Sequence, residues 1–246
     1  MKQQIWTEEY KIASYLVNLR GKAGLYAILN FIQDVGWLHA INMQVKLEKN
    51  LGWVFTRQKL EMLEWPKWNQ VITIRTWLRP PHGSFLLRDY EIFLGDKKIG
   101  DCTSTFSVMD MQTRKLAVMD WNAYGAVWCE SGLLSHKPER IPLATETLDL
   151  AQFEVRNSDI DLNNHVNNTR YAQWILDAIP IDVLRTGAEL KSYEVNFLAE
   201  TKTGDFVKVQ KGLHDAVDGS ASVIQFQGLR AADLKPVFTA VMRVLA

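Results

Sequence analysis

Residues 156–180 read RNSDIDLNNHVNNTRYAQWILDAIP, a polar loop followed directly by a segment with helical periodicity. In that segment the apolar side chains recur at the spacing of one helix face: Tyr171, Trp174, Ile175, Ala178 and Ile179. Asn167 or Asn168 is suited to cap the helix, because a short amide side chain accepts hydrogen bonds from the first turn, and Pro180 ends the pattern. The stretch therefore predicts a buried helix that begins beside His165.

The loop before this helix carries candidate catalytic groups. A helix N-terminus offers unpaired N–H donors and a partial positive charge, which suit an oxyanion, and His165 is of the residue type that titrates near neutral pH. Asp161, Asn163 and His165 occupy alternate positions, so in an extended loop their side chains would point to one side. The other side would then be anchored by apolar residues: Ile160, Leu162 and Val166.

Metal-binding and purely structural roles explain this loop less well. A calcium loop that began at Asp159 would need Gly and Glu where Asn164 and Arg170 stand, and His165 has no His or Cys neighbour at zinc-ligand spacing. We therefore expect no metal and no cofactor. An Asx-rich turn that only caps the helix explains any one of these side chains, but it explains the whole set less well.

The segment SDIDLNNHVNN at 158–168, with Tyr171 and Trp174 on the helix after it, resembles the signature of the acyl-ACP thioesterases. These enzymes of plastids and bacteria end fatty-acid synthesis by hydrolysing acyl-acyl carrier protein. Other segments resemble the first half of that family in order and spacing: LGWVF at 51–55, WPKW at 65–68, TW at 76–77, LRDY at 87–90 and MQTRKL at 111–116. The resemblance covers nearly the whole chain. We expect a bacterial member of the family, because the N-terminal segment has no Arg/Ser-rich transit stretch.

The composition is that of a globular protein without bulk charge. Hydrophobic residues make up 47% of the 246, and 28 basic residues balance 28 acidic ones, which removes any bulk argument for binding nucleic acid or a membrane surface. Two cysteines are too few for a disulfide scaffold, and no apolar run approaches the roughly 20 residues of a membrane span. Because the N-terminal segment lacks signal and transit features, we expect a cytoplasmic location.

The chain as a whole predicts two α+β units in tandem. A strand at 10–18 and a largely apolar helix at 25–41 precede strands at 53–63, 70–78, 85–94 and 98–108. Residues 111–150 lose this periodicity and predict a crossing segment with some helix near 121–129. The order then begins again, with a strand at 152–156, the helix after His165, and strands at 190–198, 205–213, 221–229 and 237–244.

Two alignments support the repeat, since Glu200 falls over Glu64, 136 residues earlier, and Trp174 over Trp37, 137 residues earlier. The pattern alone allows two separate α+β domains. The thioesterase resemblance implies instead two tandem hotdog units, each a central helix wrapped by an antiparallel sheet, with the sheets joined edge to edge. We assign 1–125 to an N-terminal hotdog unit for acyl-chain selection, 126–150 to a linker and 151–246 to a C-terminal hotdog unit with the catalytic loop.

The resemblance also implies four catalytic side chains: Asp161, Asn163, His165 and Glu200. Because neither cysteine is near the motif in sequence and a threonine without a strong base is a poor nucleophile, we expect water as the attacking group. Glu200 would be the general base. Thr201 stands where plant members of the family have a cysteine, so a thiol nucleophile is not expected. Asn163 and the backbone N–H groups of Val166 and Asn167 would hold the thioester carbonyl. His165 would polarise that carbonyl or shuttle the proton, and Asp161 would orient its neighbours. The apolar helix of the first half would line the acyl pocket, and we select three of its residues: Ala27, Leu29 and Ile32.

The expected reaction is hydrolysis of acyl-ACP to a free fatty acid. The alternatives are an acyl-CoA thioesterase, a hotdog dehydratase or hydratase of 3-hydroxyacyl thioesters, and a non-catalytic acyl-binding protein. The expected partners are acyl carrier protein and a fatty acyl chain, and the chain is expected to be a monomer or a homodimer. The acidic carrier should meet basic residues near the motif, for which the candidates are Arg170, Lys191 and Lys202.

Overall fold

The computed structural model describes residues 2–44, 47–121, 127–130, 132, 134–135, 137–162, 164–213, 216–218 and 220–245. The chain divides into two compact units, Met1–Pro138 and Glu139–Ala246. The division falls inside the stretch 126–150, for which a linker is predicted. No helix in the described part of the chain is long and apolar enough to cross a bilayer.

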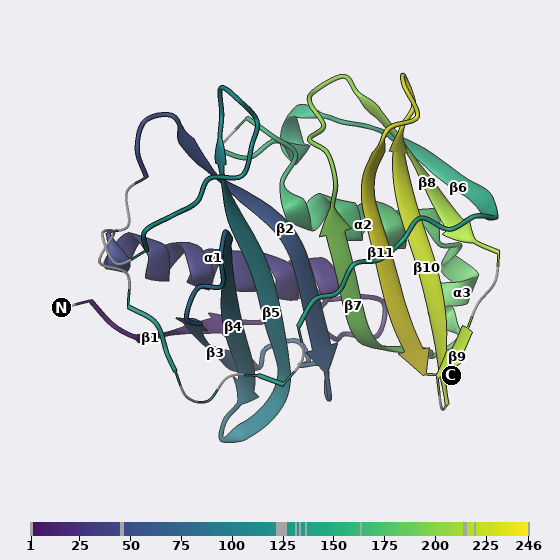
Figure 1. The fold of residues 1–246 in the computed structure, drawn as a ribbon. Helices are drawn as coiled ribbons and strands as arrows, with labels where there is room; N and C mark the ends of the chain where they lie inside the picture. The colour runs from purple at the N-terminus through teal and green to yellow at the C-terminus, as the bar shows by residue number, and fades with distance from the viewer. Residues whose placement is uncertain are drawn as a thin grey trace. The chain divides into compact units, whose positions relative to one another are not determined.

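The first unit, as far as it is described, is a five-stranded antiparallel sheet with one long helix on one face (Figure 1). Its elements are β1 (Ile5–Lys11), the 3-10 helix η1 (Ser14–Leu16), α1 (Leu25–Met43), β2 (Leu51–Met62), β3 (Val71–Leu78), β4 (Phe85–Leu94) and β5 (Lys97–Asp110). The strand order is β1-β3-β4-β5-β2, and α1 contacts β1 and β3. The helix therefore covers the face of the sheet that holds the core of this unit.

Helix α1 buries the face that its sequence periodicity predicts. Most of the buried side chains form one stripe: Leu25, Ile28, Leu29, Ile32, Val35 and His39. Ala27 lies outside this stripe and is also fully buried. The opposite side is less enclosed than the apolar sequence suggests, since Trp37 is 55% and Ile41 61% exposed. The helix is thus not enclosed around its whole circumference.

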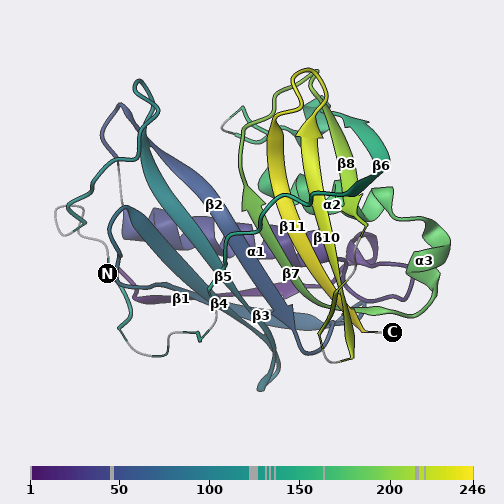
Figure 2. The same ribbon diagram turned by 45° about the vertical axis from the view of Figure 1, so that its right-hand side comes forward.

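The second unit repeats this architecture with a shorter central helix (Figures 1 and 2). Its elements are β6 (Thr147–Glu154), the 3-10 helix η2 (Asn157–Asp159), α2 (Asn168–Ala178), α3 (Ile181–Arg185), β7 (Glu189–Phe197), β8 (Phe206–Gly212), β9 (Ala216–Asp218), β10 (Ala221–Arg230) and β11 (Pro236–Leu245). The strand order is β7-β11-β10-β8-β6, and the short β9 pairs with β10. Helix α2 contacts β6 and β8.

The order of the elements confirms the predicted repeat, because β1-β3-β4-β5-β2 in the first unit corresponds to β6-β8-β10-β11-β7 in the second. The residue-by-residue alignment is wrong by one position at the strand ends. Two successive N–H groups after β2, the second that of Glu64, donate to one carbonyl of β5. Two successive N–H groups after β7, the second that of Ala199, donate to one carbonyl of β11. Glu64 therefore corresponds to Ala199 and not to Glu200. The tryptophan alignment also fails, since Trp37 is exposed whereas Trp174 is buried.

Three predicted elements differ from the structure. The strand predicted at 10–18 is wrong, because the chain pairs with β3 over Ile5–Lys11 and then turns into η1. Strand β6 begins at Thr147, inside the predicted linker. Trp121 and residues 127–129 are not helical, and 122–126, where the rest of that predicted helix falls, lie outside the described residues.

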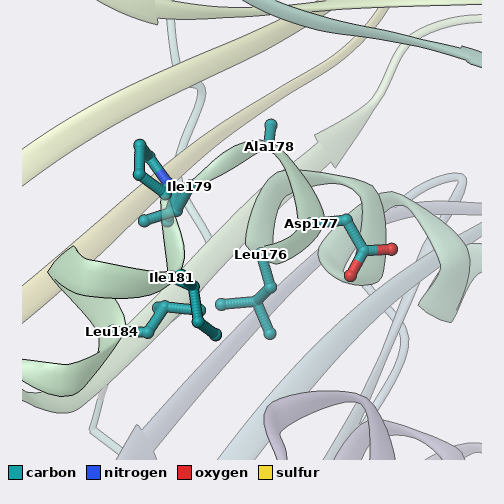
Figure 3. Close-up of a pocket in the computed structure, with 7 residues that line it drawn as sticks. Leu176, Asp177, Ala178, Ile179, Ile181 and Leu184 are labelled. Carbon is teal, nitrogen blue, oxygen red and sulfur yellow. The ribbon is translucent and has the colours of Figure 1, made fainter.

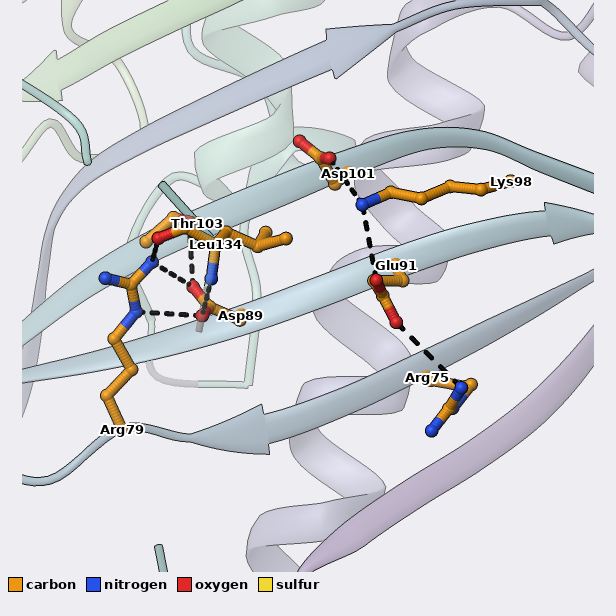
Figure 4. A network of polar contacts seen from close by, with 8 residues as sticks. All are labelled: Arg75, Arg79, Asp89, Glu91, Lys98, Asp101, Thr103 and Leu134. Carbon is orange, nitrogen blue, oxygen red and sulfur yellow. Dashed lines mark hydrogen bonds and ion pairs between the residues drawn. The ribbon is translucent and has the colours of Figure 1, made fainter. Parts of the chain in front are cut away.

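A buried polar network on the first sheet holds the segment that follows it (Figure 4). Asp89 of β4 accepts hydrogen bonds from Arg79 Nε and Nη2, each 2.8 Å, from Thr103 Oγ1 (2.8 Å) and from the Leu134 N–H (3.1 Å). Arg79 in turn donates to the Leu134 carbonyl (2.8 Å). A more exposed chain of ion pairs lies beside it on the same strands: Arg75, Glu91, Lys98 and Asp101.

In the second unit, residues 139–144 bond to polar side chains of the sheet. Asn196 accepts from the Ile141 N–H (2.8 Å) and donates to the Glu139 carbonyl (2.9 Å), and Thr239 Oγ1 donates to the Ile141 carbonyl (3.0 Å). The segment predicted as a linker is therefore shared between the two units, because each sheet carries buried polar groups that bond to part of it.

Candidate active site

The loop before α2 is a tight turn and not the extended segment that its alternation of polar and apolar residues predicts. Ile160 and Val166 form an antiparallel bridge. The Asp161 N–H donates to the His165 carbonyl (2.8 Å), and the Asn164 N–H donates to the Asp161 carbonyl (3.0 Å). Asn164 has a φ of 60°, in the left-handed region that asparagine tolerates better than most residues. The chain therefore reverses direction within this loop.

Because the chain reverses, the polar and apolar side chains of the loop do not point to opposite sides as predicted. Val166 is buried at the base of the turn, whereas Leu162 at the tip is 96% exposed and anchors nothing. Asn163 lies outside the described residues. Asp161 turns inward, since its Oδ1 accepts from the His165 N–H at 3.4 Å, which holds the backbone of the histidine.

Asp159 ties the loop to helix α2. Its carboxylate accepts from the Arg156 N–H (2.9 Å) and lies 3.5 Å from the Arg170 guanidinium, and its carbonyl accepts from the Asn167 N–H (2.8 Å). This side chain is buried, as a paired carboxylate can be. Asp159 thus has a structural role that explains part of the acidic character of the motif.

Asn167 caps α2, as predicted, because its Oδ1 accepts from the Thr169 N–H and hydroxyl, each at 3.0 Å. The predicted oxyanion donors, however, already have acceptors within the protein. The Asn167 N–H donates to the Asp159 carbonyl at 2.8 Å, and the Val166 N–H points to the Thr201 carbonyl at 3.4 Å. These contacts argue against both N–H groups as oxyanion donors, because a strong donor to substrate must be free to make that bond.

His165 and Glu200, 35 positions apart in the sequence, meet in the structure. Nε2 of His165 lies 3.7 Å from Oε2 of Glu200. Their side chains are 36% and 38% exposed, so both can reach solvent or a substrate. An imidazole and a carboxylate at this distance form an acid–base pair that can take a proton from water and return one to a leaving group.

A contact between two buried hydroxyl groups joins α2 to Thr201, the residue that follows Glu200. Tyr171 Oη of α2 and Thr201 Oγ1 lie 2.9 Å apart, and Thr201 has no exposed surface. Burial raises the pKa of Tyr171 to about 12, so the phenol stays protonated at neutral pH. The sequence periodicity predicted that Tyr171 lies on the buried face of the helix, but it did not predict the contact of its hydroxyl with Thr201. The signal for its second role is chemical, because a buried tyrosine hydroxyl usually has a hydrogen-bond partner.

The turn before α2 has a counterpart of the same shape before α1. In the first unit the Asn18 N–H donates to the Lys22 carbonyl (2.7 Å), and the Gly21 N–H donates to the Asn18 carbonyl (3.0 Å). Gly21 has a φ of 67°, close to the 60° of Asn164. An antiparallel bridge between Val17 and Ala23 likewise corresponds to the bridge between Ile160 and Val166.

The chemistry of the two turns differs although their hydrogen bonds match. Asn18 takes the place of Asp161, and Lys22 takes the place of His165. The Pro66 carbonyl accepts from the N–H at the base of the first turn, as that of Thr201 does in the second, so Trp65 takes the place of Glu200. The first unit therefore keeps the backbone of the loop without its acid–base pair.

A shallow pocket of about 380 Å³ lies at the opposite end of α2 from His165 (Figure 3). It is lined by residues of α2, α3 and the turn between them: Leu176, Asp177, Ala178, Ile179, Pro180, Ile181 and Leu184. Eleven residues of helix span roughly 16 Å, so this pocket is separate from the acid–base pair. None of the predicted site residues lines it.

Cys102 and Cys129 are both buried residues of the first unit, and burial raises the pKa of the Cys102 thiol well above its usual value. Within the described part of the chain, no three His, Cys, Asp or Glu side chains are grouped closely enough to hold a metal ion.

Two of the three basic candidates for carrier binding have acidic neighbours in the same unit. Arg170 lies 3.5 Å from Asp159, and Lys191 lies 3.9 Å from Glu189. Lys202 is exposed and follows Glu200 by two positions. Arg170 and Lys191 are each only partly exposed.

Two family models match this chain: the acyl-ACP thioesterase N-terminal domain over residues 3–124 and the acyl-ACP thioesterase C-terminal domain over residues 144–232. The chain belongs to the acyl-ACP thioesterase family. A chloroplast oleoyl-acyl carrier protein thioesterase of Coriandrum sativum is 28% identical over 225 residues, which are 82% of this chain and 61% of that protein. Oleoyl-acyl carrier protein thioesterase 2 of Arabidopsis thaliana is 27% identical over 227 residues, with the same two shares. The chain thus spans about three fifths of the length of these relatives.

Solved acyl-ACP thioesterase structures share the fold. One from Bacteroides thetaiotaomicron has a TM-score of 0.85 and 24% identity, covering 98% of each chain. The 12:0-ACP thioesterase of Umbellularia californica has a TM-score of 0.83 and 17% identity, covering 99% of this chain and 95% of that one. Together with the repeated topology, these likenesses confirm the predicted α+β fold of two tandem hotdog units. The edge-to-edge joining of the two sheets stays a prediction.

Proposed function

We propose that this acyl-ACP thioesterase family member hydrolyses the thioester of acyl-[acyl carrier protein], releases a free fatty acid and so terminates fatty-acid synthesis. The observation that carries the proposal is the approach of His165 to Glu200 at 3.7 Å beside the N-terminus of α2. Family membership supplies the thioester as substrate class, and the exposed imidazole and carboxylate supply the acid–base chemistry that hydrolysis needs.

In this mechanism Glu200 is the general base. Its carboxylate takes a proton from a water molecule while the water oxygen attacks the thioester carbonyl carbon. The carbonyl oxygen becomes an oxyanion, and the C–S bond then breaks as the carbonyl re-forms. The departing carrier thiolate receives a proton from the pair formed by His165 and Glu200, which restores the starting charge of the site.

The oxyanion needs a donor other than the two backbone groups that are already engaged. We assign this role to the Asn163 side-chain amide, with His165 polarising the same carbonyl. Asp161 orients the loop, which is supported by the contact of its carboxylate with the His165 N–H. Asp161, Asn163, His165 and Glu200 are thus the four proposed catalytic side chains.

Water is a better attacking group here than a side chain. Thr201, next to Glu200, is buried and shares a hydrogen bond with Tyr171, so its hydroxyl is not activated by a neighbouring base. Cys102 is a buried thiol whose raised pKa disfavours the nucleophilic thiolate.

Mutation of the acid–base pair tests the proposal. Glu200→Ala and His165→Ala should each lower kcat on acyl-ACP by roughly 10²–10⁴, because each removes a positioned proton-transfer group. Cys102→Ser and Thr201→Ser are the matched controls and should keep most of the activity. Turnover close to wild type in a folded Glu200→Ala variant would exclude the general-base role.

A substrate panel separates the remaining functions. Short, medium and long acyl chains on carrier protein and on CoA are incubated with the enzyme, and both free thiol and double-bond formation are measured. Thiol release from acyl-ACP in preference to acyl-CoA supports the proposal. Thiol release from CoA substrates alone, double-bond formation from 3-hydroxyacyl thioesters, or tight binding without turnover would each assign one of the alternatives.

Partner and location follow the same proposal. Acyl carrier protein is the expected partner, with Lys202 as the first basic residue to test. A cytoplasmic location and a monomeric or homodimeric state stay predictions. Measurement of molecular mass in solution, with and without carrier protein, checks the oligomeric state.

A further inference from the structure

An arginine outside the sequence motif contacts the strand end that carries Glu200. Arg230 is the last residue of β10, and its Nη1 donates to the Glu200 carbonyl at 3.4 Å. The Arg230 side chain is 24% exposed. The two residues are 30 positions apart in the sequence, so only the folded chain brings them together.

A second set of contacts holds the guanidinium in one orientation. Arg230 Nε and Nη2 donate to the two carboxylate oxygens of Asp233, at 3.0 Å and 2.7 Å. The hydrogen bonds from Arg230 lower the pKa of Asp233 to about 2, so the pair stays ionised at neutral pH. Because a bidentate pair fixes the plane of the guanidinium, the third nitrogen, Nη1, is directed at the Glu200 carbonyl.

The turn between β10 and β11 keeps both members of this pair in place. The Arg230 N–H donates to the Lys235 carbonyl (2.9 Å), and the Leu234 N–H donates to the Arg230 carbonyl (2.8 Å). The Lys235 N–H also donates to the Asp233 carboxylate at 3.2 Å. The backbone of the turn is therefore closed by hydrogen bonds around the arginine and the aspartate.

The residues on either side of Glu200 are bonded to other elements of the second unit. The Ala199 N–H donates to a carbonyl of β11 at 3.3 Å, and the Thr201 hydroxyl lies 2.9 Å from Tyr171 Oη. Arg230 adds a contact to the peptide group of Glu200 itself. Because the Glu200 side chain is 38% exposed, the hydrogen bonds of the backbone beneath it help to decide where its carboxylate lies.

The internal repeat gives the position in the first unit that corresponds to Arg230. The ladder of the last two long strands has a bulge in each unit, after Ile92 in β4 and after Gly228 in β10. Leu94 and Arg230 each follow their bulge by two residues, and each is the last residue of its strand. Leu94 therefore takes the place of Arg230.

The contact to the strand end is thus confined to the unit that holds the acid–base pair. The first unit has Lys22 in the place of His165 and Trp65 in the place of Glu200. Leu94 cannot donate a hydrogen bond from its side chain. Since both units build the same sheet, the fold itself does not require an arginine here, and its presence follows the chemistry of the second unit.

We propose that Arg230 is a positioning residue that holds the Glu200 carboxylate in place beside His165. The inference rests on the proposed function, in which Glu200 is the general base. Arg230 bonds to the backbone of Glu200, so it acts through that residue and not on the substrate. A general base must lie within hydrogen-bond reach of the proton that it takes. Loss of the contact should therefore slow the chemical step and leave the binding of acyl-ACP nearly unchanged.

Substitution of Arg230 tests this role. Arg230→Met should lower kcat per active site on acyl-ACP by about tenfold and change KM little, since small misplacements of a reacting group are costly. Titration of active sites removes unfolded protein from the comparison. Arg230→Lys, which can still donate to the Glu200 carbonyl, should recover part of the rate. Arg185→Met is the matched control, because Arg185 of α3 pairs with Asp182 at 3.0 Å with the same spacing in sequence, and it should leave kcat unchanged.

The same substitution in a Glu200→Ala background separates positioning from a purely structural role. If Arg230 acts through Glu200, Arg230→Met should cause no further loss of the residual activity there. A further fall of the same size would overturn the inference, because it would show an effect that does not depend on the carboxylate. A change confined to KM would overturn it as well, since it would assign Arg230 to substrate binding.

The outcomes also distinguish this inference from the proposed function. Unchanged kcat in folded Arg230→Met, together with an inactive Glu200→Ala variant, would overturn the inference while the proposed function stands. Absence of acyl-ACP hydrolysis in the wild type would overturn both. If Arg230→Met does not fold, Asp233→Asn takes its place, because it keeps the guanidinium and removes the charge that orients it. A lower kcat per active site in Asp233→Asn supports the inference, and an unchanged kcat rejects it.

Discussion

The hydroxyl of Tyr171 lies 2.9 Å from the hydroxyl of Thr201, so the central helix of the second unit bonds directly to the residue after Glu200. The Val166 N–H points to the carbonyl of the same threonine at 3.4 Å. The loop that carries His165 and the strand end that carries Glu200 are therefore connected at Thr201. This connection sets the distance between the two acid–base groups.

Tyr171→Phe should lower kcat by about tenfold through the position of Glu200, since small misplacements of reacting groups are costly, and should change KM little. It should also lower the free energy of unfolding by about 1 kcal/mol for the lost hydrogen bond. Steady-state kinetics and urea unfolding measure the two effects. Tyr193→Phe is the control, because the Tyr193 hydroxyl is buried and has no partner among the described residues. Equal effects of the two substitutions on kcat would contradict a positioning role.

The acyl pocket assigned to α1 predicts a change of substrate preference. Leu29→Ala and Ile32→Ala should favour longer chains and Ala27→Leu shorter ones, because these three side chains are buried in the first unit. Each buried methylene is worth about 0.8 kcal/mol, so two carbons of chain length correspond to a change of roughly tenfold in the ratio of rates. The ratio of kcat/KM on long and short acyl-ACP measures it.

Val195→Ala is the control for this series, because Val195 is fully buried in the second unit. This substitution should lower stability without changing the ratio of kcat/KM on long and short acyl-ACP. If the α1 variants lose stability and activity on all chain lengths alike, α1 is ordinary core and the first unit does not select the acyl chain.

The buried His39 predicts a loss of stability in acid. Burial and the adjacent Arg88 lower the pKa of His39 from the ordinary 6.5 to about 4, so the unfolded chain takes up a proton before the folded chain does. The free energy of unfolding should therefore fall as the pH is lowered from about 6.5 to 4, by up to about 3 kcal/mol from this group. Urea unfolding at a series of pH values measures the slope. His39→Asn, which keeps an acceptor for Arg88 and cannot titrate, should show a smaller slope; an unchanged slope would exclude His39 as its source.

Asp89 and Glu91 lie on the same strand, and we expect their substitution to lower the free energy of unfolding by different amounts (Figure 4). Asp89→Ala leaves the buried Arg79 without its carboxylate and should lower the free energy of unfolding by roughly 3–5 kcal/mol. Glu91→Ala removes partly exposed ion pairs and should cost less than about 1 kcal/mol. The double variant Arg79→Met/Asp89→Leu should recover part of the loss. Similar values for Asp89→Ala and Glu91→Ala would show that the buried network does not stabilise the fold as described.

The first unit should hold no second catalytic site. Lys22→Ala and Glu64→Gln should leave kcat/KM nearly unchanged, because Lys22 replaces the histidine of the turn and Glu64 pairs with Lys97. His165→Ala is the reference that should lose activity. Titration of active sites with a mechanism-based acyl probe should give one site per chain, and a count of two would refute the asymmetry.

Local sequence signals determined the parts of this protein that depend on near neighbours. The helix after His165, its cap at Asn167 and its buried face follow from spacing and from side chains that bond within one turn. Most strands lie within a few residues of their predicted ranges, because alternation of apolar residues needs only the pleat of the strand itself. The repeated order of elements was visible for the same reason.

The tertiary structure decided everything that depends on which distant segments pair. The strand order β1-β3-β4-β5-β2 and its repeat come from long-range pairing between strands. Pairing with β3 is also the reason that the first strand spans Ile5–Lys11 and not the predicted 10–18. The 3.7 Å contact of His165 with Glu200 and the hydrogen bond from the Asn167 N–H to the Asp159 carbonyl each join residues that are not sequence neighbours. The same holds for Arg88 Nη1, which lies 2.7 Å from His39 Nδ1. Periodicity reports which face of an element is buried, whereas hydrogen bonds and ion pairs between elements depend on register, which only the folded chain fixes.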